Sequence, residues 1–179
     1  GSLSVAATGL KGIRGAGVQG YFEPTYFIND NLSIFSGLSA NHSPDMLIWQ
    51  HDNLLGSFRV NQFSLNAGLQ WSIGSKQELR VKLETIGLGA HLTQAWRVAA
   101  DGTPIAVNEP ISDFALRNLG FQIRYRYELA PLSNLYIVYA RGGSLFEQPG
   151  LDATDEFRNA FRLRDAEQLL IKLSYRFEI

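Results

Sequence analysis

The sequence predicts an all-β fold, namely an antiparallel, up-and-down transmembrane β-barrel of about eight strands that forms a single domain over residues 1–179. One observation is that four segments alternate apolar and polar residues, as a β-strand does when its two faces meet different media. These segments are residues 62–73, 78–85, 119–129 and 169–179. A second observation is that short polar turns alternate with longer connections, which is typical of barrels in bacterial outer membranes.

The expected strands follow one another in an order that the turn residues define. Asn, Asp, Gly, Pro and Ser favour turns, and they form tight connections at residues 29–31, 74–77 and 130–134. Longer connections fall at residues 10–17, 41–56, 98–112 and 142–167. The strands between them are residues 3–9, 18–28, 32–40, 57–73, 78–97, 113–129, 135–141 and 168–179. An even number of strands places both chain ends on the side of the short turns.

Parts of the chain fit this pattern less well. Pro24 has no amide hydrogen to donate to a neighbouring strand. The apolar positions change phase between Val60 and Phe63, which predicts a β-bulge there. Residues 155–168 have an apolar spacing that fits either a short helix or a loop.

The composition excludes several classes of protein. The chain has 16 basic and 17 acidic residues and no cysteine, so neither a basic surface for nucleic acid nor a thiolate metal site is expected. No run of about 18 apolar residues is present, which excludes a membrane-spanning helix but not membrane-spanning strands. We therefore expect no nucleic-acid partner, no metal and no cofactor. Gly1 and Ser2 are interpreted as a tag remnant.

The main alternative is a soluble, lipocalin-like barrel, which keeps its apolar face inside. The long connections at one end favour lipid outside instead, and so do two sets of side chains. Aromatic residues end the apolar phase near the short turns, as in the girdle of a membrane barrel: Tyr26, Trp71, Tyr125, Tyr127, Tyr175 and Phe177. The polar phase carries charges of both signs that we expect to pair in a narrow lumen: Arg80, Lys82, Glu84, Arg124, Arg126, Glu128, Lys172, Arg176 and Glu178, together with Glu78.

The last residues resemble the terminal signal that the bacterial barrel-assembly machinery reads. That signal has a polar residue, then a glycine, then two hydrophobic residues at alternate positions, and the matching residues are Lys172, Ser174, Phe177 and Ile179. The sequence departs from it at Ser174, where glycine is usual, and at Ile179, where a terminal Phe is commonest. The resemblance implies an outer-membrane location, with the assembly machinery as a partner during biogenesis.

A second resemblance covers about the last two-thirds of the chain. Residues 77–83, 121–129 and 135–143 resemble the end of a poorly characterised family of outer-membrane proteins, whose members carry a carbohydrate-binding family 9-like domain before a barrel. This resemblance implies no catalytic residue. It implies that the chain could be the C-terminal part of a longer protein.

One grouping suggests catalysis, and it consists of His42, Ser43 and Asp45 on an expected extracellular loop. Some outer-membrane enzymes that modify lipids use a His–Ser pair, in which the imidazole takes the hydroxyl proton. Neighbouring residues of a strand point to opposite faces, so this pair would need a loop to meet. The simpler interpretation is a set of loop residues, and we expect no enzyme activity.

The sequence thus predicts a monomeric structural or anchoring domain in a Gram-negative outer membrane. Its partners would be membrane lipid and lipopolysaccharide, and its extracellular loops would serve surface interactions. One alternative is a porin-like pore or transporter segment of a larger barrel, because about eight strands leave a lumen that side chains fill, whereas more strands leave a channel. Another alternative is an enzyme that modifies outer-leaflet lipid.

Overall fold

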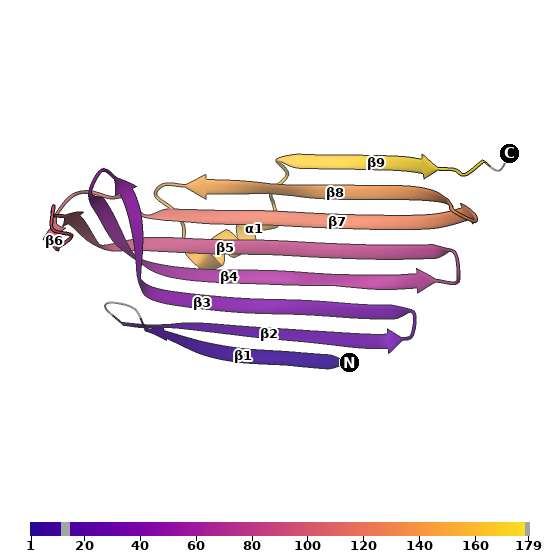
Figure 1. Ribbon diagram of the computed structural model, residues 1–179, viewed down its shortest axis with the longest axis horizontal. Coiled ribbons are helices and arrows are strands. Elements are labelled where there is room, and N and C mark those ends of the chain that lie inside the picture. The colour runs from indigo at the N-terminus through magenta and orange to yellow at the C-terminus, as the bar shows by residue number, and fades with distance from the viewer. Residues whose placement is uncertain (12–14, 178–179) are drawn as a thin grey trace.

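The computed structural model describes residues 1–11 and 15–177, most of which lie in antiparallel strands (Figure 1). The strands are β1 (Ser2–Lys11), β2 (Ala16–Asn29), β3 (Leu32–His51), β4 (Leu54–Ile73), β5 (Gln77–Val98), β6 (Pro104–Val107), β7 (Phe114–Ala130), β8 (Ser133–Glu147) and β9 (Ala166–Ser174). A short helix, α1 (Ala153–Ala160), lies between β8 and β9.

The nine strands of the described residues form one antiparallel sheet. Its order is β1-β2-β3-β4-β5-β7-β8-β9, and β6 pairs with the end of β5. Each long strand therefore pairs with the next long strand along the chain, which confirms the predicted all-β, up-and-down arrangement. The sheet is open, with β1 and β9 at its edges. As predicted, β1 begins and β9 ends on the side of the short turns (Figure 1).

The hairpin of β3 and β4 is longer than predicted. Both strands continue through residues 41–56, which we expected to be a loop, and a tight turn at Asp52 and Asn53 joins them. The loop interpretation was wrong because the polar residues of this segment pair with residues of the opposite strand. Pro44 is tolerated because it lies in the register shift between Ser43 and Met46, where the ladder needs no amide hydrogen. The far ends of both strands bend away from the main sheet (Figure 1).

The register of β4 also differs from the prediction. Pairing is continuous from Val60 to Phe63, and the register against β5 shifts between Ser57 and Phe58 instead. The apolar side chains do switch from one face of the sheet to the other between Val60 and Phe63, but no bulge causes the switch. Val60 packs in a buried cluster on one face of the sheet, whereas Phe63 lies on the opposite face.

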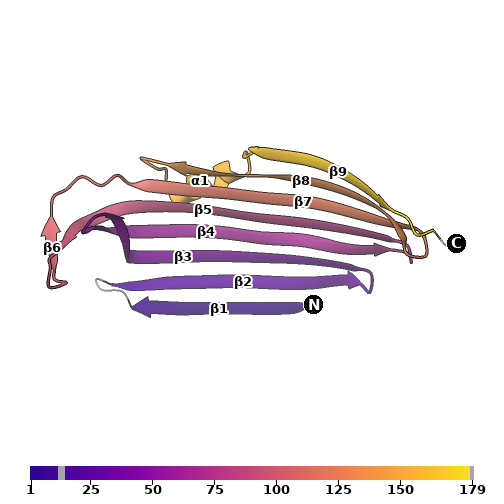
Figure 2. The ribbon, with the colours of Figure 1, turned by 45° about the horizontal axis from the view of Figure 1, so that its top comes forward.

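The two faces of the sheet differ in polarity, and the polarity of each face changes from one end of the strands to the other. One face, called the helix face here, carries α1 over β4, β5 and β7 (Figures 1 and 2). Its half nearer the short turns is apolar. The opposite face, called the charged face, carries ionised side chains in that same half. In its far half it carries a buried apolar cluster of Phe58, Val60 and Ala90, against which Ile111 packs.

Residues 155–168, for which the sequence left helix and loop open, contain most of α1 and the connection to β9. Asp155 and Glu156 occupy the first turn of α1 and Arg158 the last, a charge order that the helix dipole favours. Beneath the end of the helix, Leu119 of β7 forms a small buried cluster with Ala160 and Leu163. This cluster joins α1 and the segment after it to the helix face.

Two glycines of β5 allow α1 to approach the sheet closely. A Cβ built on Gly87 would lie 2.2 Å from the backbone nitrogen of Phe157, and a Cβ on Gly89 would lie 2.8 Å from that of Ala153. A side chain at either position would therefore overlap the helix backbone, so the close approach requires glycine.

We expect Gly87→Ala to push α1 away from the sheet. The added Cβ must displace helix backbone rather than a flexible side chain, and overpacking of this kind costs about 1–3 kcal/mol. Limited proteolysis between residues 148 and 165 should become faster. Gly120→Ala in β7 is the matched control, because a Cβ there meets nothing within 4 Å. Equal cleavage rates in the two variants would contradict the role assigned to Gly87.

Candidate functional site

The helix face carries a continuous apolar band in its half nearer the short turns. The strand register aligns the band in rows across the sheet, and one row contains Ile34, Leu69, Val81, Ile123, Tyr139 and Leu169. Along β5 the band runs from Gln77 to Thr85, and a strand needs about 9–11 tilted residues to cross a membrane. Parts of the band are open, and Leu169 is 65% exposed. The band has about the height of one membrane crossing.

Four of the predicted girdle residues lie on the apolar band, three of them towards the short turns. Their register places them on the helix face, and they are Tyr26, Trp71, Tyr125 and Tyr127. The hydroxyl of Tyr125 donates a hydrogen bond of 2.7 Å to Gln77 Oε1. Tyr175 and Phe177 follow the end of β9, where their exposed rings lie 5.0 Å apart. Trp71, Tyr125 and Tyr127 thus lie in the two rows nearest the short turns, whereas Tyr26 lies in the middle row beside Ile34.

The charged face carries seven of the predicted lumen residues. Their register places them opposite to the apolar band, and they are Arg80, Lys82 and Glu84 on β5, Arg124, Arg126 and Glu128 on β7, and Lys172 on β9. Arg176 follows β9, and its backbone N–H donates to Ser133 Oγ at 3.0 Å. Glu178 and Ile179 lie outside the described residues. The predicted assembly signal can therefore be followed only at Lys172, Ser174 and Phe177.

Some of these charges form ion pairs on the open sheet. The ion pairs are Arg80–Glu78, Lys82–Glu84 at 2.6 Å and Arg126–Glu78 at 3.6 Å. The register sets Arg124 directly opposite Arg80, however, and like charges in that position repel. No ion pair joins Arg124 within residues 1–11 and 15–177. The sequence of one strand does not reveal which residue of the next strand faces it, so sequence analysis did not identify the opposition of Arg80 and Arg124.

The candidate catalytic grouping of His42, Ser43 and Asp45 is not assembled. His42 and Ser43 are consecutive residues of β3 rather than loop residues, so their side chains point to opposite faces. His42 Nδ1 lies 2.7 Å from Asn61 Oδ1 on β4. Asp45 also belongs to β3, and in the described part of the chain no hydrogen bond or ion pair links it to His42 or Ser43. The geometry therefore offers no His–Ser dyad.

An ion-pair network that sequence analysis missed holds α1 against the helix face. Arg117 of β7 contacts Glu156 of α1 and Glu147 of β8, each at 3.0 Å. The side chain of Glu156 is only 1% exposed and that of Arg117 only 14%. Glu147 and Glu156 lie 30 and 39 residues from Arg117 along the chain, and no local pattern indicates such distant partners. The network fixes Glu156, on the buried side of α1, to the sheet.

His91 forms a second link to α1, called the His91 clasp here. Its Nδ1 lies 3.0 Å from Asp113, and its Nε2 lies 3.0 Å from Asp152, the residue before α1. The hydrogen bond to Asp113 is the main reason that the pKa of His91 is raised, and Asp152 adds to it against the effect of burial. Burial acts to raise the pKa of Asp113, but hydrogen bonds from the Leu92 amide and His91 lower it overall. The clasp lies beyond the apolar band on β5.

The His91 clasp should make the docking of α1 depend on pH. Because the pKa of His91 is raised in the folded protein, the clasp contributes fully below about pH 6.5, the ordinary pKa of histidine. Its contribution should disappear as the pH rises through the higher pKa of folded His91. A nitroxide on Arg158→Cys, whose native side chain is 74% exposed, should become more mobile over that pH range. In a His91→Gln background its mobility should not change with pH; the same pH profile in both proteins would exclude the clasp as the cause.

The described residues hold no candidate metal centre and no candidate membrane-spanning helix. They contain no group of three or more His, Asp or Glu side chains placed to hold a metal ion, and none of their helices has the length and hydropathy to cross a membrane. The candidate site therefore consists of the apolar band, the charged face behind it and the docked helix. Comparison of the chain with protein-family models, curated proteins and solved structures gave no match.

Proposed function

We propose that this chain is a membrane-embedded structural domain of a Gram-negative outer membrane, with the apolar band against lipid and the charged face towards the interior of a barrel. The observation that carries the proposal is the apolar band itself. It runs across β1 to β9 at about the height of one membrane crossing, and aromatic residues border it at the short-turn end. Membrane barrels combine these same features.

The open edges of the sheet support the closure of such a barrel. β1 runs away from the short turns and β9 runs towards them (Figure 1). The two edges are therefore antiparallel, as an up-and-down barrel requires of any two strands that it joins. Closure would satisfy the unpaired backbone groups of both edges, which lipid cannot do.

The end of the sheet beyond the apolar band would extend from the outer surface. It contains the tip of the β3–β4 hairpin, the β5–β6 pair and α1. Trp49 near the hairpin tip is 64% exposed. Surface interactions of the domain, including contacts with lipopolysaccharide, would involve these elements. The proposal includes no catalytic step. It assigns the predicted signal of Lys172, Ser174, Phe177 and Ile179 to recognition by the barrel-assembly machinery.

A second candidate function is a pore segment of a larger barrel, and the opposition of Arg80 and Arg124 favours it. Two facing guanidinium groups are costly in a narrow lumen without water. In a wider, water-filled lumen they would be solvated, and they would favour the passage of anions.

Two measurements test these candidates. A membrane barrel should fold only with detergent or lipid and should show heat-modifiable mobility on a gel, whereas a protein that is folded and soluble without detergent would refute the proposal. Planar-bilayer recordings then separate the two functions. Stable open channels with anion preference, weakened by Arg124→Gln, would establish the pore, and a silent bilayer with correctly folded protein would establish the structural domain.

A further inference from the structure

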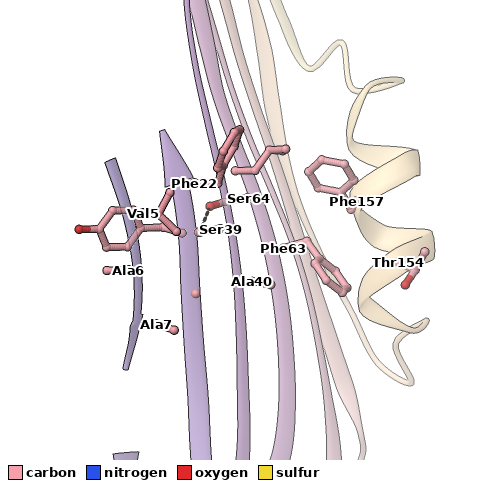
Figure 3. A pocket seen from close by; sticks show the side chains of 13 residues that line it. Val5, Ala6, Ala7, Phe22, Ser39, Ala40, Phe63, Ser64, Thr154 and Phe157 are labelled. Atoms are coloured by element: carbon pink, nitrogen blue, oxygen red, sulfur yellow. Dashed lines mark hydrogen bonds between the residues drawn. The ribbon is translucent and has the colours of Figure 1, made fainter. Parts of the chain in front are cut away.

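An apolar hollow of about 630 Å³ lies on the helix face between α1 and the first four strands (Figure 3). Its floor is formed by small residues of β1, β2 and β3, namely Ala7, Gly20 and Ala40. A Cβ built on Gly20 would meet only one atom within 4 Å, a carbonyl oxygen at 3.8 Å. The hollow therefore has free space above its floor, because the residues of the floor have small side chains or none.

The wall of the hollow is fixed in place. Phe157 projects from α1 towards the sheet, and Phe63 of β4 lies across from it (Figure 3). The close approach at Gly87, the Arg117 network and the His91 clasp all hold α1 at this position. The space beside the helix thus results from the same contacts that dock the helix.

The chemistry of the lining selects an uncharged, aliphatic occupant. None of the described residues that line the hollow is charged, and the hydroxyls of Ser39 and Ser64 are bonded to each other. Val5, Phe22 and Leu38 line the hollow and also form the last row of the apolar band. The hollow is therefore continuous with the band, and its volume lies within the range of about 300–1,000 Å³ that is usual for small-molecule sites.

We propose that this hollow holds one acyl chain of an outer-leaflet lipid, bound between α1 and strands β1 to β4. The inference rests on the proposed function, which puts the apolar band against lipid. The chain would run from its headgroup at the surface side, past Phe157, through the hollow and on to the apolar band, so α1 would form the wall beside its upper part. The remaining acyl chains of the same leaflet would contact the band without a fixed place.

The absence of cysteine from the chain allows a direct test with single labelled sites. An environment-sensitive fluorophore is attached to Ala40→Cys on the floor of the hollow and, separately, to Ala67→Cys. Ala67 lies on the helix face within the band but does not line the hollow. Each protein is reconstituted into phosphatidylcholine vesicles in which a fraction of the lipid has brominated acyl chains, which quench the fluorophore on contact. Gly20→Leu fills the hollow, and Phe157→Ala removes its wall.

We expect the fluorophore to be quenched at both sites when no further substitution is present. When Gly20→Leu or Phe157→Ala is added, quenching should fall several-fold at residue 40 and should not change at residue 67. Quenching at residue 67 without quenching at residue 40 would overturn the acyl-chain site and leave the proposed function standing. Quenching that neither added substitution alters would also overturn it, because the hollow would then be ordinary lipid boundary. Absence of quenching at both sites in folded protein would overturn the membrane proposal itself.

Discussion

Arg117→Met is expected to release α1 from the sheet, at a cost of about 3–5 kcal/mol in docking free energy. The reason is that Glu156, 1% exposed, would lose the guanidinium that lies 3.0 Å from its carboxylate. An unpaired carboxylate in a buried site is far less favourable than a buried pair. Hydrogen exchange of the α1 amides, which reports the free energy of local opening, measures the effect.

Two further variants separate lost pairing from lost packing. Glu156→Met should cost less than Arg117→Met, because Arg117 keeps its contact with Glu147. The double variant Arg117→Met/Glu156→Met should recover much of the loss, since it removes both buried charges together. If the double variant were as poorly docked as Arg117→Met, the carboxylate would not be the cause. Arg80→Met, which breaks an exposed pair with Glu78, should change stability by less than about 1 kcal/mol.

Ile123→Lys is expected to destabilise the sheet in a lipid bilayer by about 2–4 kcal/mol, the cost of a charge near the midplane of a barrel's lipid face. Ile123 lies in the middle row of the apolar band. The neighbouring Gln122→Lys is the matched control, because it places the same side chain on the charged face opposite Lys82. There the like-charge contact should cost less than about 1 kcal/mol.

Guanidinium titration of both variants in vesicles, followed by tryptophan fluorescence, measures the two effects. Their difference is the informative quantity, because the two substitutions are adjacent on β7 and share one backbone environment. Equal losses would mean that the helix face does not meet lipid. A larger loss for Gln122→Lys would reverse the assignment and place the charged face outside.

Much of the sheet follows from the sequence because period-two alternation is a local signal. Val81 and Arg80 are adjacent, and the pattern alone assigns them to opposite faces, as the register confirms. Turn residues likewise gave the strand order, since each short connection joins neighbours. Gly74, with a φ of +63°, stands where its tight turn needs a left-handed residue.

The rest of the molecule depends on contacts between distant residues, which no local pattern encodes. Polar residues such as Asn41 favour a loop in the sequence, although strand pairing continues through them. Nothing in the spacing of residues near Gly87 indicates that a helix would lie above it. The sequence predicts an ion pair between Arg124 and a carboxylate, but the register between β5 and β7 places Arg80 opposite Arg124.

The neighbour-to-neighbour order of the sheet has a consequence for how the chain folds. Every ladder between long strands joins segments that are close in sequence, so each hairpin can form without a large loss of loop-closure entropy. Contact order is correspondingly low for the ladders of the open sheet. In a barrel closed as proposed, the pairing of β1 with β9 would join residues far apart in the sequence and would be a late, slow step. Mutations at the edges β1 and β9 should therefore slow the last folding step, while mutations in β4 or β5 should act on earlier ones.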